Sequence, residues 1–335
     1  MNNRNMNKSI LHTPDGVRDI YGEELRFRRD VQNRILSVMG SQGYSEIVTP
    51  VFEYFDVFSR DIGTTPSKEL YKLFDREGET LALRPDFTPS VARSAARYFL
   101  NDSNTVLPLR FFYCGNTFNN SRPLLGRPSE VTQAGVELIG AGDAVSDAEV
   151  VSLLIRCLRE AGLESFTVSL GNASYFRGLC GEAGLCEEDE LSLRDHISGR
   201  NWFAAEDLLR ELGIDTEIRE KLLSVIDLSG DPSVLDTAAE NAGNPLSEEA
   251  VNRLRETCRL IGDMGLSRYV SFDLGLLSRY NYYTGIVFRA YTFGVGEAVA
   301  MGGRYDRLLA KFGKDCPATG FAIVLDNVIT ALGKR

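Results

Sequence analysis

Apolar side chains recur along the chain at spacings that predict helices and strands. Between residues 26 and 39 they lie three or four positions apart, which predicts a helix ending near Gly40. Residues 44–53 alternate β-branched and polar side chains and predict a strand that Pro50 interrupts. The same patterns predict, in chain order, a hairpin over 70–84, a helix over 88–100, two strands over 107–114 and 129–139 joined by a long loop, a helix over 146–161 and a strand over 166–170.

The pattern changes near Gly171 to helical, Glu- and Leu-rich stretches broken by Gly and Pro. Residues 175–262 are therefore predicted to form an inserted helical subdomain. The segments that follow predict strands over 270–275, 282–291 and 298–303, a helix over 306–312, a strand over 320–324 and a final helix from residue 325. This order favours an α+β fold, with a flexible tail over 1–9 and a core domain formed by 10–174 and 263–335.

Composition narrows the class of protein. The chain has 335 residues, of which 43% are hydrophobic and 25% charged, as in ordinary globular proteins. It contains no run of 18 apolar residues and no apolar stretch near its first residue, so neither a membrane span nor a secretory signal is expected. The expected location is the cytoplasm. The net charge of −10 argues weakly against a nucleic-acid partner.

Residues for metal, cofactor or nucleophilic chemistry are scarce. Six cysteines are scattered without a CxxC pair, and the only histidines are His12 and His196. A zinc site and a histidine-dependent hydrolase are therefore not expected. The cysteines are expected to be reduced and mostly packed. The chain also lacks a GxGxxG turn and a Walker A sequence, so no cofactor is predicted.

Four short segments combine glycine with charged or aromatic residues at the ends of predicted strands. They are residues 83–88 (LRPDFT), 135–137 (GVE), 282–285 (YYTG) and 302–306 (GGRYD). Taken singly, each has an ordinary explanation as a turn, a core aromatic or a helix cap. Their combination, order and spacing carry the signal.

In this order the segments resemble the catalytic domain of histidyl-tRNA synthetase over nearly the whole chain. Residues 14–19 are similar to its N-terminal signature. Residues 44–53, with the continuation to 62–63, are similar to motif 1, which forms the dimer. Residues 110–140 are similar to motif 2 and 320–326 to motif 3. The resemblance implies a class II aminoacyl-tRNA synthetase-like antiparallel sheet flanked by helices, with a helical insertion.

The chain departs from the synthetases where adenylation needs arginine. Asn119 stands in place of the motif 2 arginine, Asn327 in place of the motif 3 arginine, and Ser278 in place of an arginine before the Tyr-Tyr pair. Arginine stabilises charge on a phosphate during adenylation, and losing one such donor costs roughly 3–4 kcal/mol. The chain is therefore expected not to be an enzyme. Because it ends shortly after Asn327, no anticodon-binding domain is expected either.

The amino-acid pocket of the resembled family is largely retained. By resemblance, Asp86, Thr88 and Gln133 face the ammonium group of free histidine. Glu137 and Tyr283 face the imidazole, while Tyr282 and Tyr305 line the pocket. Asp86 replaces a glutamate of the synthetases. The alternative is that these side chains only maintain an inherited fold.

A synthetase-like chain without these arginines is similar to the regulatory subunits of ATP phosphoribosyltransferase. This resemblance implies a partner, the short-form catalytic subunit, which performs the first step of histidine biosynthesis. It also implies a dimer through motif 1, a hetero-octamer, and feedback inhibition by histidine as effector. Two other functions stay open: a stand-alone histidine-binding scaffold and a truncated histidine-adenylating enzyme.

Overall fold

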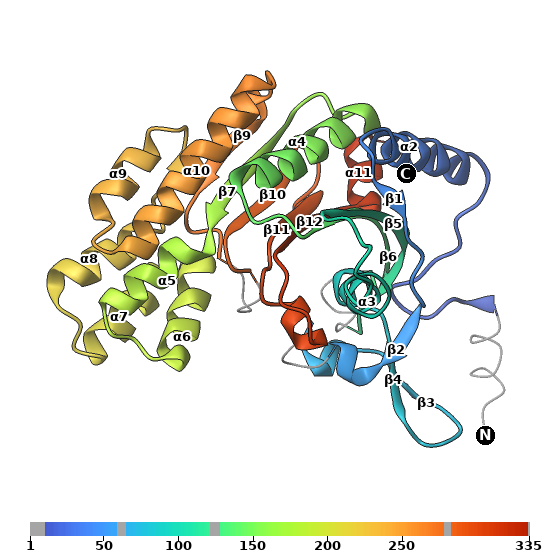
Figure 1. The fold of residues 1–335 in the computed structure, drawn as a ribbon, viewed down its shortest axis with the longest axis horizontal. Coiled ribbons are helices and arrows are strands. Elements are labelled where there is room, and N and C mark those ends of the chain that lie inside the picture. Colours follow the sequence, from blue (N-terminus) through green and yellow to red (C-terminus); the bar gives the residue numbers. More distant parts are fainter. Residues whose placement is uncertain (1–10, 59–64, 121–127, 278–282, 334–335) are drawn as a thin grey trace.

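The computed structural model describes residues 11–58, 65–120, 128–277 and 283–333 (Figure 1). The expected tail over 1–9 lies outside these residues. So do residues 62–63 of motif 1, most of the loop before residue 128, and both Ser278 and Tyr282. The described residues form a large sheet, a small sheet and helices that cover both faces of the large sheet.

The large sheet has nine strands in the order β1-β5-β6-β12-β11-β10-β7-β9-β8. Its strands are β1 (Ser45–Glu46), β5 (Leu109–Phe118), β6 (Glu130–Ile139), β7 (Phe166–Asn172), β8 (Ser229–Gly230), β9 (Val270–Asp273), β10 (Ile286–Thr292), β11 (Ala300–Arg304) and β12 (Ala318–Val324). Neighbouring strands are antiparallel except for β1 with β5 and β7 with β9, which are parallel. The expected antiparallel arrangement therefore holds for the centre of the sheet, whereas the whole sheet is mixed.

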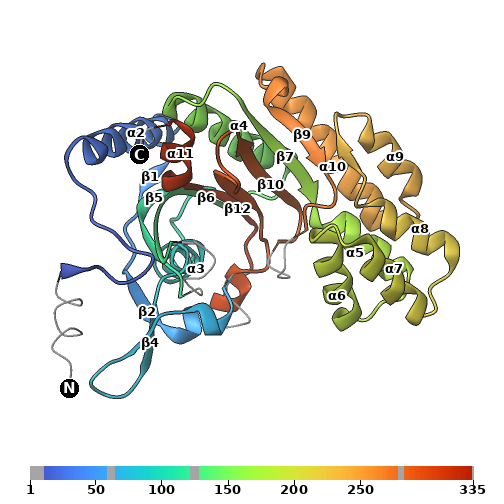
Figure 2. The ribbon, with the colours of Figure 1, turned by 180° about the vertical axis from the view of Figure 1, so that it is seen from behind.

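Helices cover both faces of this sheet. On one face lie α2 (Gly22–Ser41), α4 (Ala144–Ala161) and α11 (Leu325–Ala331), seen above the sheet in Figure 1 and from behind in Figure 2. On the other face, α3 (Thr88–Ser94) and the short η6 turn (Leu309–Phe312) pack over β5 and β12 through a second apolar cluster. Glu137 and the other described residues of the predicted pocket lie on this α3 side.

A three-stranded sheet stands apart, in the order β2-β4-β3. Its strands are β2 (Phe52–Tyr54), β3 (Lys72–Phe74) and β4 (Thr80–Leu83). The predicted hairpin over 70–84 is confirmed, and Asp75 stabilises its turn by accepting from the backbone N–H groups of Glu77 and Glu79. The predicted strand over 44–53 splits at Pro50 into β1 and β2, which join different sheets.

Between β7 and β9 the chain forms a block of helices, coloured yellow-green to orange in Figure 1. Polar N-caps begin several of them: the side chains of Asn172, Asn201, Asp215 and Asn244 each accept a backbone N–H. Strand β8 lies within the block yet pairs with β9, and α10 packs on α4. The helices are α5 (Ala173–Glu182), α6 (Glu187–Ser198), α7 (Trp202–Glu211), α8 (Thr216–Ser224), α9 (Val234–Asn241) and α10 (Pro245–Asp263).

Several predicted elements differ in detail. The helix expected over 88–100 is α-helical only to Ser94 and continues as a π-helix over Ala95–Phe99. The helix expected over 306–312 is a short 3-10 turn. The strand expected over 107–114 extends to Phe118, because each of its ten residues pairs with a residue of β6. Pairing with a partner strand, which local patterns do not specify, sets this length.

Candidate functional site

A buried arginine fixes the turn between β4 and α3, where two of the expected pocket residues lie. The Arg84 guanidinium donates to the carbonyls of Asn116 (2.8 Å) and Thr49 (3.0 Å) and lies 4.0 Å above the Phe87 ring. Arg84 thereby joins three segments far apart in sequence. The turn that follows it carries Asp86 and delivers Thr88 to the first position of α3.

Glu137 projects from the C-terminal part of β6, opposite a row of glycines on the neighbouring strands. Across the sheet its register partner is Gly320 of β12, and the partner of Gly320 is Gly303 of β11. A Cβ at Gly320 would overlap Oε2 of Glu137 and the carbonyl of Val136. Glycine at this position therefore gives the carboxylate its space.

Two hydroxyl groups donate to the Glu137 carboxyl. Thr88 Oγ1 donates to Oε1 at 2.6 Å, and the Tyr305 hydroxyl donates to Oε2. Glu137 is 1% exposed. The structure thus joins α3, β6 and the segment after β11 at one buried acid.

Two carboxyl groups share this site, and burial shifts both. Burial raises the pKa of Glu137 to about 8, against the lowering effect of its two hydrogen bonds, and nearby Asp86 raises it further. Burial also raises the pKa of Asp86 to about 7, while the backbone N–H of Thr88 lowers it. Near neutral pH the pair therefore holds protons that a cationic ligand would displace.

Aromatic rings flank the two acids. Tyr113 stacks on Phe87 with ring centroids 4.3 Å apart, and burial raises the pKa of the Tyr113 hydroxyl, with Glu137 and Asp86 adding to the effect. Tyr283 lies against Gly303, where a Cβ would come within 2.8 Å of its ring. Burial likewise raises the pKa of Tyr283, and the charge of Glu137 raises it further.

Gln133 lies on the same face of β6 as Glu137, four residues away or roughly 13 Å along the strand. Its Oε1 atom is buried and accepts no hydrogen bond from the described residues. Gln133 therefore has an acceptor that the described residues leave unused.

The described residues of the expected pocket fall into one cluster and one outlying member. Asp86, Thr88, Glu137, Tyr283 and Tyr305 come together, Gln133 lies farther along β6, and Tyr282 is outside the described residues. The Thr88 hydroxyl donates to Glu137, and its expected position beside an ammonium group stays a prediction.

Two contributors were not found from sequence, Arg84 and Tyr113. Arg84 acts only by positioning the β4–α3 turn. For Tyr113 the available signal was the alternation of side chains along β5, since this alternation places the Tyr113 ring on the same face of the sheet as Glu137.

Asn119 and Asn327, two of the three positions predicted to replace adenylation arginines, lie within the described residues. The Asn327 amide donates to the Ala298 carbonyl at 2.9 Å, which ties α11 to the turn before β11. Oδ1 of Asn119 is buried and accepts no hydrogen bond from the described residues. Ser278 lies outside the described residues.

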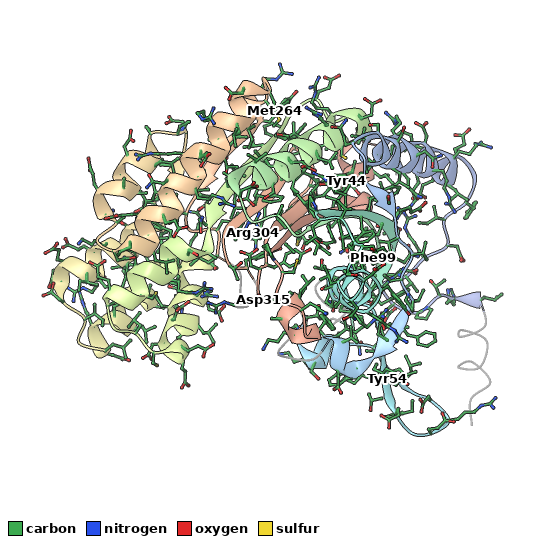
Figure 3. The ribbon with its side chains drawn as sticks, in the orientation of Figure 1. Tyr44, Tyr54, Phe99, Met264, Arg304 and Asp315 are labelled. Carbon is green, nitrogen blue, oxygen red and sulfur yellow. The ribbon has the colours of Figure 1, made fainter. Side chains whose placement is uncertain are left out.

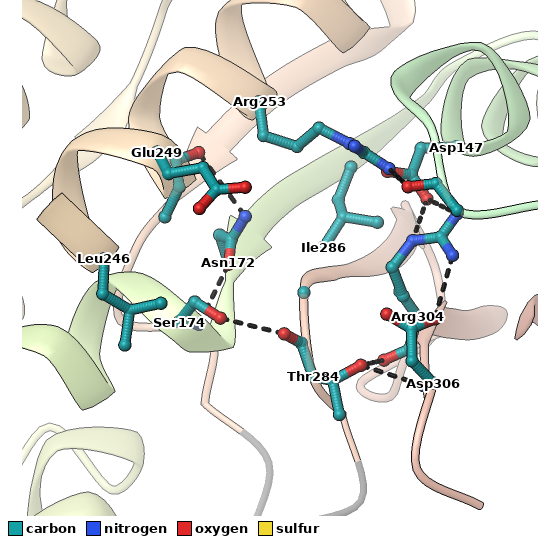
Figure 4. Close-up of a pocket in the computed structure, with 13 residues that line it drawn as sticks. Asp147, Asn172, Ser174, Leu246, Glu249, Arg253, Thr284, Ile286, Arg304 and Asp306 are labelled. Atoms are coloured by element: carbon teal, nitrogen blue, oxygen red, sulfur yellow. Dashed lines mark hydrogen bonds and ion pairs between the residues drawn. The ribbon is translucent and has the colours of Figure 1, made fainter. Parts of the chain in front are cut away.

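A second polar cluster connects the sheet to the helical block (Figure 4). Asp147 of α4 is fully buried between Arg304 of β11 (2.9 Å) and Arg253 of α10 (2.7 Å). Burial lowers the pKa of Arg304, but the charge of Asp147 and hydrogen bonds raise it overall. The cluster borders a cavity of about 260 Å³ between α10 and β10.

Arg304 also links this cluster to the first site. Its Nη1 atom donates to Asp306 at 2.9 Å, next to the Tyr305 that bonds Glu137. The Asp306 N–H in turn donates to Thr284, which follows Tyr283.

Within the described segments, no helix is both long and apolar enough to cross a membrane.

Comparison with known proteins gives consistent matches. The model of the histidyl-tRNA synthetase family matches residues 16–328. An ATP phosphoribosyltransferase regulatory subunit from Acetivibrio thermocellus is 39% identical over 325 residues, covering 97% of this chain and 77% of that protein. A protein of the same name from Clostridium acetobutylicum is 35% identical, covering 96% of this chain and 79% of that protein.

Solved structures agree with these relatives. The crystal structure of an ATP phosphoribosyltransferase regulatory subunit/histidyl-tRNA synthetase from Bacillus halodurans has a TM-score of 0.90 at 32% identity, covering 96% of this chain and 83% of that one. Histidyl-tRNA synthetase from Nostoc has a TM-score of 0.81 at 21% identity, covering 96% of this chain and 75% of that one. At this identity the likeness shows the fold alone. The expected class II synthetase-like α+β fold is confirmed.

Proposed function

The chain belongs to the histidyl-tRNA synthetase family and, within it, to the regulatory subunits of ATP phosphoribosyltransferase, and from this membership we propose how it acts. It binds a short-form catalytic subunit, is needed for full activity of that enzyme in histidine biosynthesis, and makes it sensitive to histidine. It performs no adenylation itself. A cytoplasmic location is part of this proposal.

Two residues, Asn327 and Asn119, support the absence of adenylation. The Asn327 amide, where a synthetase presents arginine, is engaged with the Ala298 carbonyl. Asn119 is uncharged and offers no guanidinium to a phosphate. Replacing a donor of this kind removes roughly 3–4 kcal/mol of transition-state stabilisation, so two such changes are expected to abolish the reaction.

One observation carries the assignment of histidine as the ligand: two buried carboxyl groups, Asp86 and Glu137, share a site between aromatic rings. Histidine brings an ammonium group and an imidazole N–H, which supply positive charge and donors to these acids. Gln133 offers a further buried acceptor. Binding the cation returns both acids to the charged form and lowers their pKa values.

The regulatory effect then needs only a difference in affinity between two assembly states. A ligand that binds one state 5- to 150-fold more tightly contributes about 1–3 kcal/mol of coupling. The Glu137–Tyr305–Asp306–Arg304 connection supplies a continuous path from the site to α4 and α10. We propose that this path carries the effect of histidine toward the partner subunit.

Self-association is proposed to use the small sheet. Strand β2 lies at its edge, and the sheet exposes Phe52 (52%), Tyr54 (60%) and Phe74 (72%). Tyr54 points away from the body of the molecule (Figure 3). An edge strand with exposed aromatic side chains is prone to pair with another chain. Pairing here would give the dimer from which a hetero-octamer is built.

Reconstitution tests the proposal. The chain is mixed with a short-form ATP phosphoribosyltransferase from the same source, and product formation is followed with and without histidine. Activity should rise on mixing and fall when histidine is added. Glu137→Ala should reduce inhibition while assembly and turnover persist, whereas the exposed Glu77→Ala should behave as wild type. Full inhibition of the Glu137→Ala complex would refute the pocket assignment.

The same preparation separates the other two functions. Histidine-dependent exchange between ATP and pyrophosphate would identify a truncated adenylating enzyme, and the arginine replacements predict none. Histidine binding without any effect on the transferase would identify a stand-alone scaffold.

A further inference from the structure

Two glycines continue the cross-strand row of Glu137 toward β10. Gly320 of β12 and Gly303 of β11 follow it in register, and Val287 of β10 comes next. A Cβ at Gly303 would come within 2.8 Å of the Tyr283 ring, so this ring lies over the sheet at β11. Adjacent strands are about 4.8 Å apart, which places Glu137 and Val287 roughly 14 Å from each other. Glu137 therefore marks the acidic end of this row, and β10 forms the opposite end.

Arg289 stands at the β10 end of the row. It follows Val287 by two residues and therefore projects from the same face of the sheet as Glu137. Its diagonal neighbour on β11 is Gly303, and diagonal neighbours lie about 7–8 Å apart, within reach of a long side chain. Burial raises the pKa of the Tyr283 hydroxyl, the charge of Glu137 raises it further, and the charge of Arg289 lowers it. Tyr283 thus lies near both a buried acid and a guanidinium group.

The Arg289 guanidinium makes no hydrogen bond and no ion pair with the described residues, although the side chain is half-buried. A half-buried guanidinium is normally paired with an acceptor. Arg289 borders a cavity of about 290 Å³, which leaves room for an acceptor on a ligand. The Asp273 carboxyl, which borders the same cavity, already accepts from Arg200 at 3.0 Å and from the Gly275 backbone N–H.

Other arginines around the Glu137 site are engaged. Arg84 donates to two backbone carbonyls. Arg304 is held by the buried carboxylate of Asp147, and Arg177 donates to a backbone carbonyl at 3.4 Å. Each of these three would have to give up a contact to bind a ligand, whereas Arg289 would not.

We propose that Arg289 binds the carboxylate of histidine and thereby makes the site select a zwitterionic amino acid. This inference rests on the proposed function, since it assigns a further contact to the same ligand. Histidine directs its ammonium group and imidazole N–H to Asp86 and Glu137, and its carboxylate then needs a cation. The forked donors of a guanidinium suit a carboxylate. The ligand spans the glycine row against the Tyr283 ring, from the buried acids to β10.

Calorimetric titration of the full chain at low salt tests this contact. The probes are L-histidine and L-histidinol, in which a hydroxymethyl group replaces the carboxylate. Wild type should bind histidine saturably and histidinol at least about tenfold more weakly, the loss expected for one charged hydrogen-bonding partner. Arg289→Gln should lower the affinity for histidine by a similar factor and leave the affinity for histidinol unchanged or higher. Arg76→Gln, on the exposed turn of the hairpin, is the matched control and should bind both probes as wild type does.

Two further measurements separate a ligand contact from a structural role. Arg289→Lys keeps the charge without the planar fork, so it should recover part of the affinity for histidine. In urea unfolding without ligand, Arg289→Gln should have a midpoint equal to or above that of wild type, because glutamine replaces a charge that lacks a partner among the described residues. Equal weakening of both probes by Arg289→Gln would overturn the carboxylate contact.

The outcomes also distinguish this inference from the proposed function. If wild type binds histidine and Arg289→Gln binds it equally well, the assignment of histidine as effector stands and the role of Arg289 is refuted. If wild type binds neither probe, histidine is not the ligand of this site, and both the effector assignment and the role of Arg289 are refuted.

Discussion

Replacing Glu137 by glutamine tests the central physical claim, that this acid is held in an environment hostile to its charge. Glutamine has nearly the same shape and cannot ionise. Its Oε1 can still accept from Thr88, and its amide can donate to the Tyr305 hydroxyl, so the variant is expected to fold. The variant removes only the titration.

The size of the effect comes from the pKa. Burial raises the pKa of Glu137 from an ordinary 4.5 to about 8. Since one pKa unit corresponds to about 1.4 kcal/mol, ionising Glu137 in the folded chain costs at most about 5 kcal/mol more than in the unfolded chain. The folded state binds the extra proton, so wild-type stability falls as the pH rises through this range. Between about pH 5 and about pH 8, the free energy of unfolding of the variant should rise by about 3 kcal/mol relative to that of wild type.

Urea unfolding of both proteins across this pH range measures the difference directly. Comparing the two chains cancels Asp86 and the other groups that they share, apart from the coupling between Asp86 and Glu137. Glu77→Gln, exposed on the hairpin turn, should run parallel to wild type. Saturating histidine should flatten the wild-type dependence, because a bound cation keeps Glu137 charged. If wild type and Glu137→Gln stay parallel without ligand, Glu137 ionises normally and the reasoning fails.

Three other changes follow from the geometry. Gly320→Ala places a methyl group on the Glu137 carboxyl and should abolish histidine binding by calorimetry while lowering stability by about 1–3 kcal/mol, whereas Gly181→Ala, in open space on α5, should be neutral or stabilising. Asp147→Asn leaves two guanidinium groups without their buried carboxylate and should cost about 3–5 kcal/mol in urea unfolding; a loss below about 1 kcal/mol would contradict the network. Tyr54→Asp places charge on the exposed strand β2 and should weaken self-association at least about tenfold by sedimentation, and an unchanged dimer would move the interface elsewhere.

The sequence predicted more of the fold than of the site. Helices α2 and α4, the β3–β4 hairpin and the β5–β6 pair were all expected, because their apolar spacing is strong and local. The parallel pairings of β1 with β5 and β7 with β9 were not expected, since they join strands that are distant in the chain. The change from α-helix to π-helix at Ala95, whose side chain lies in the second apolar cluster, was not expected either.

The sequence by itself indicated the family and supplied the candidate pocket residues and the predicted replacements of the adenylation arginines, because these depend on identity and order along the chain. Only the tertiary structure decided that Thr88 donates to Glu137 and that Arg84 holds the turn carrying Asp86. The physical reason is that burial and hydrogen bonding are set by neighbours across the sheet. Glu137 is an ordinary acid in the sequence, and its raised pKa exists only once strands β6 and β12 close around it.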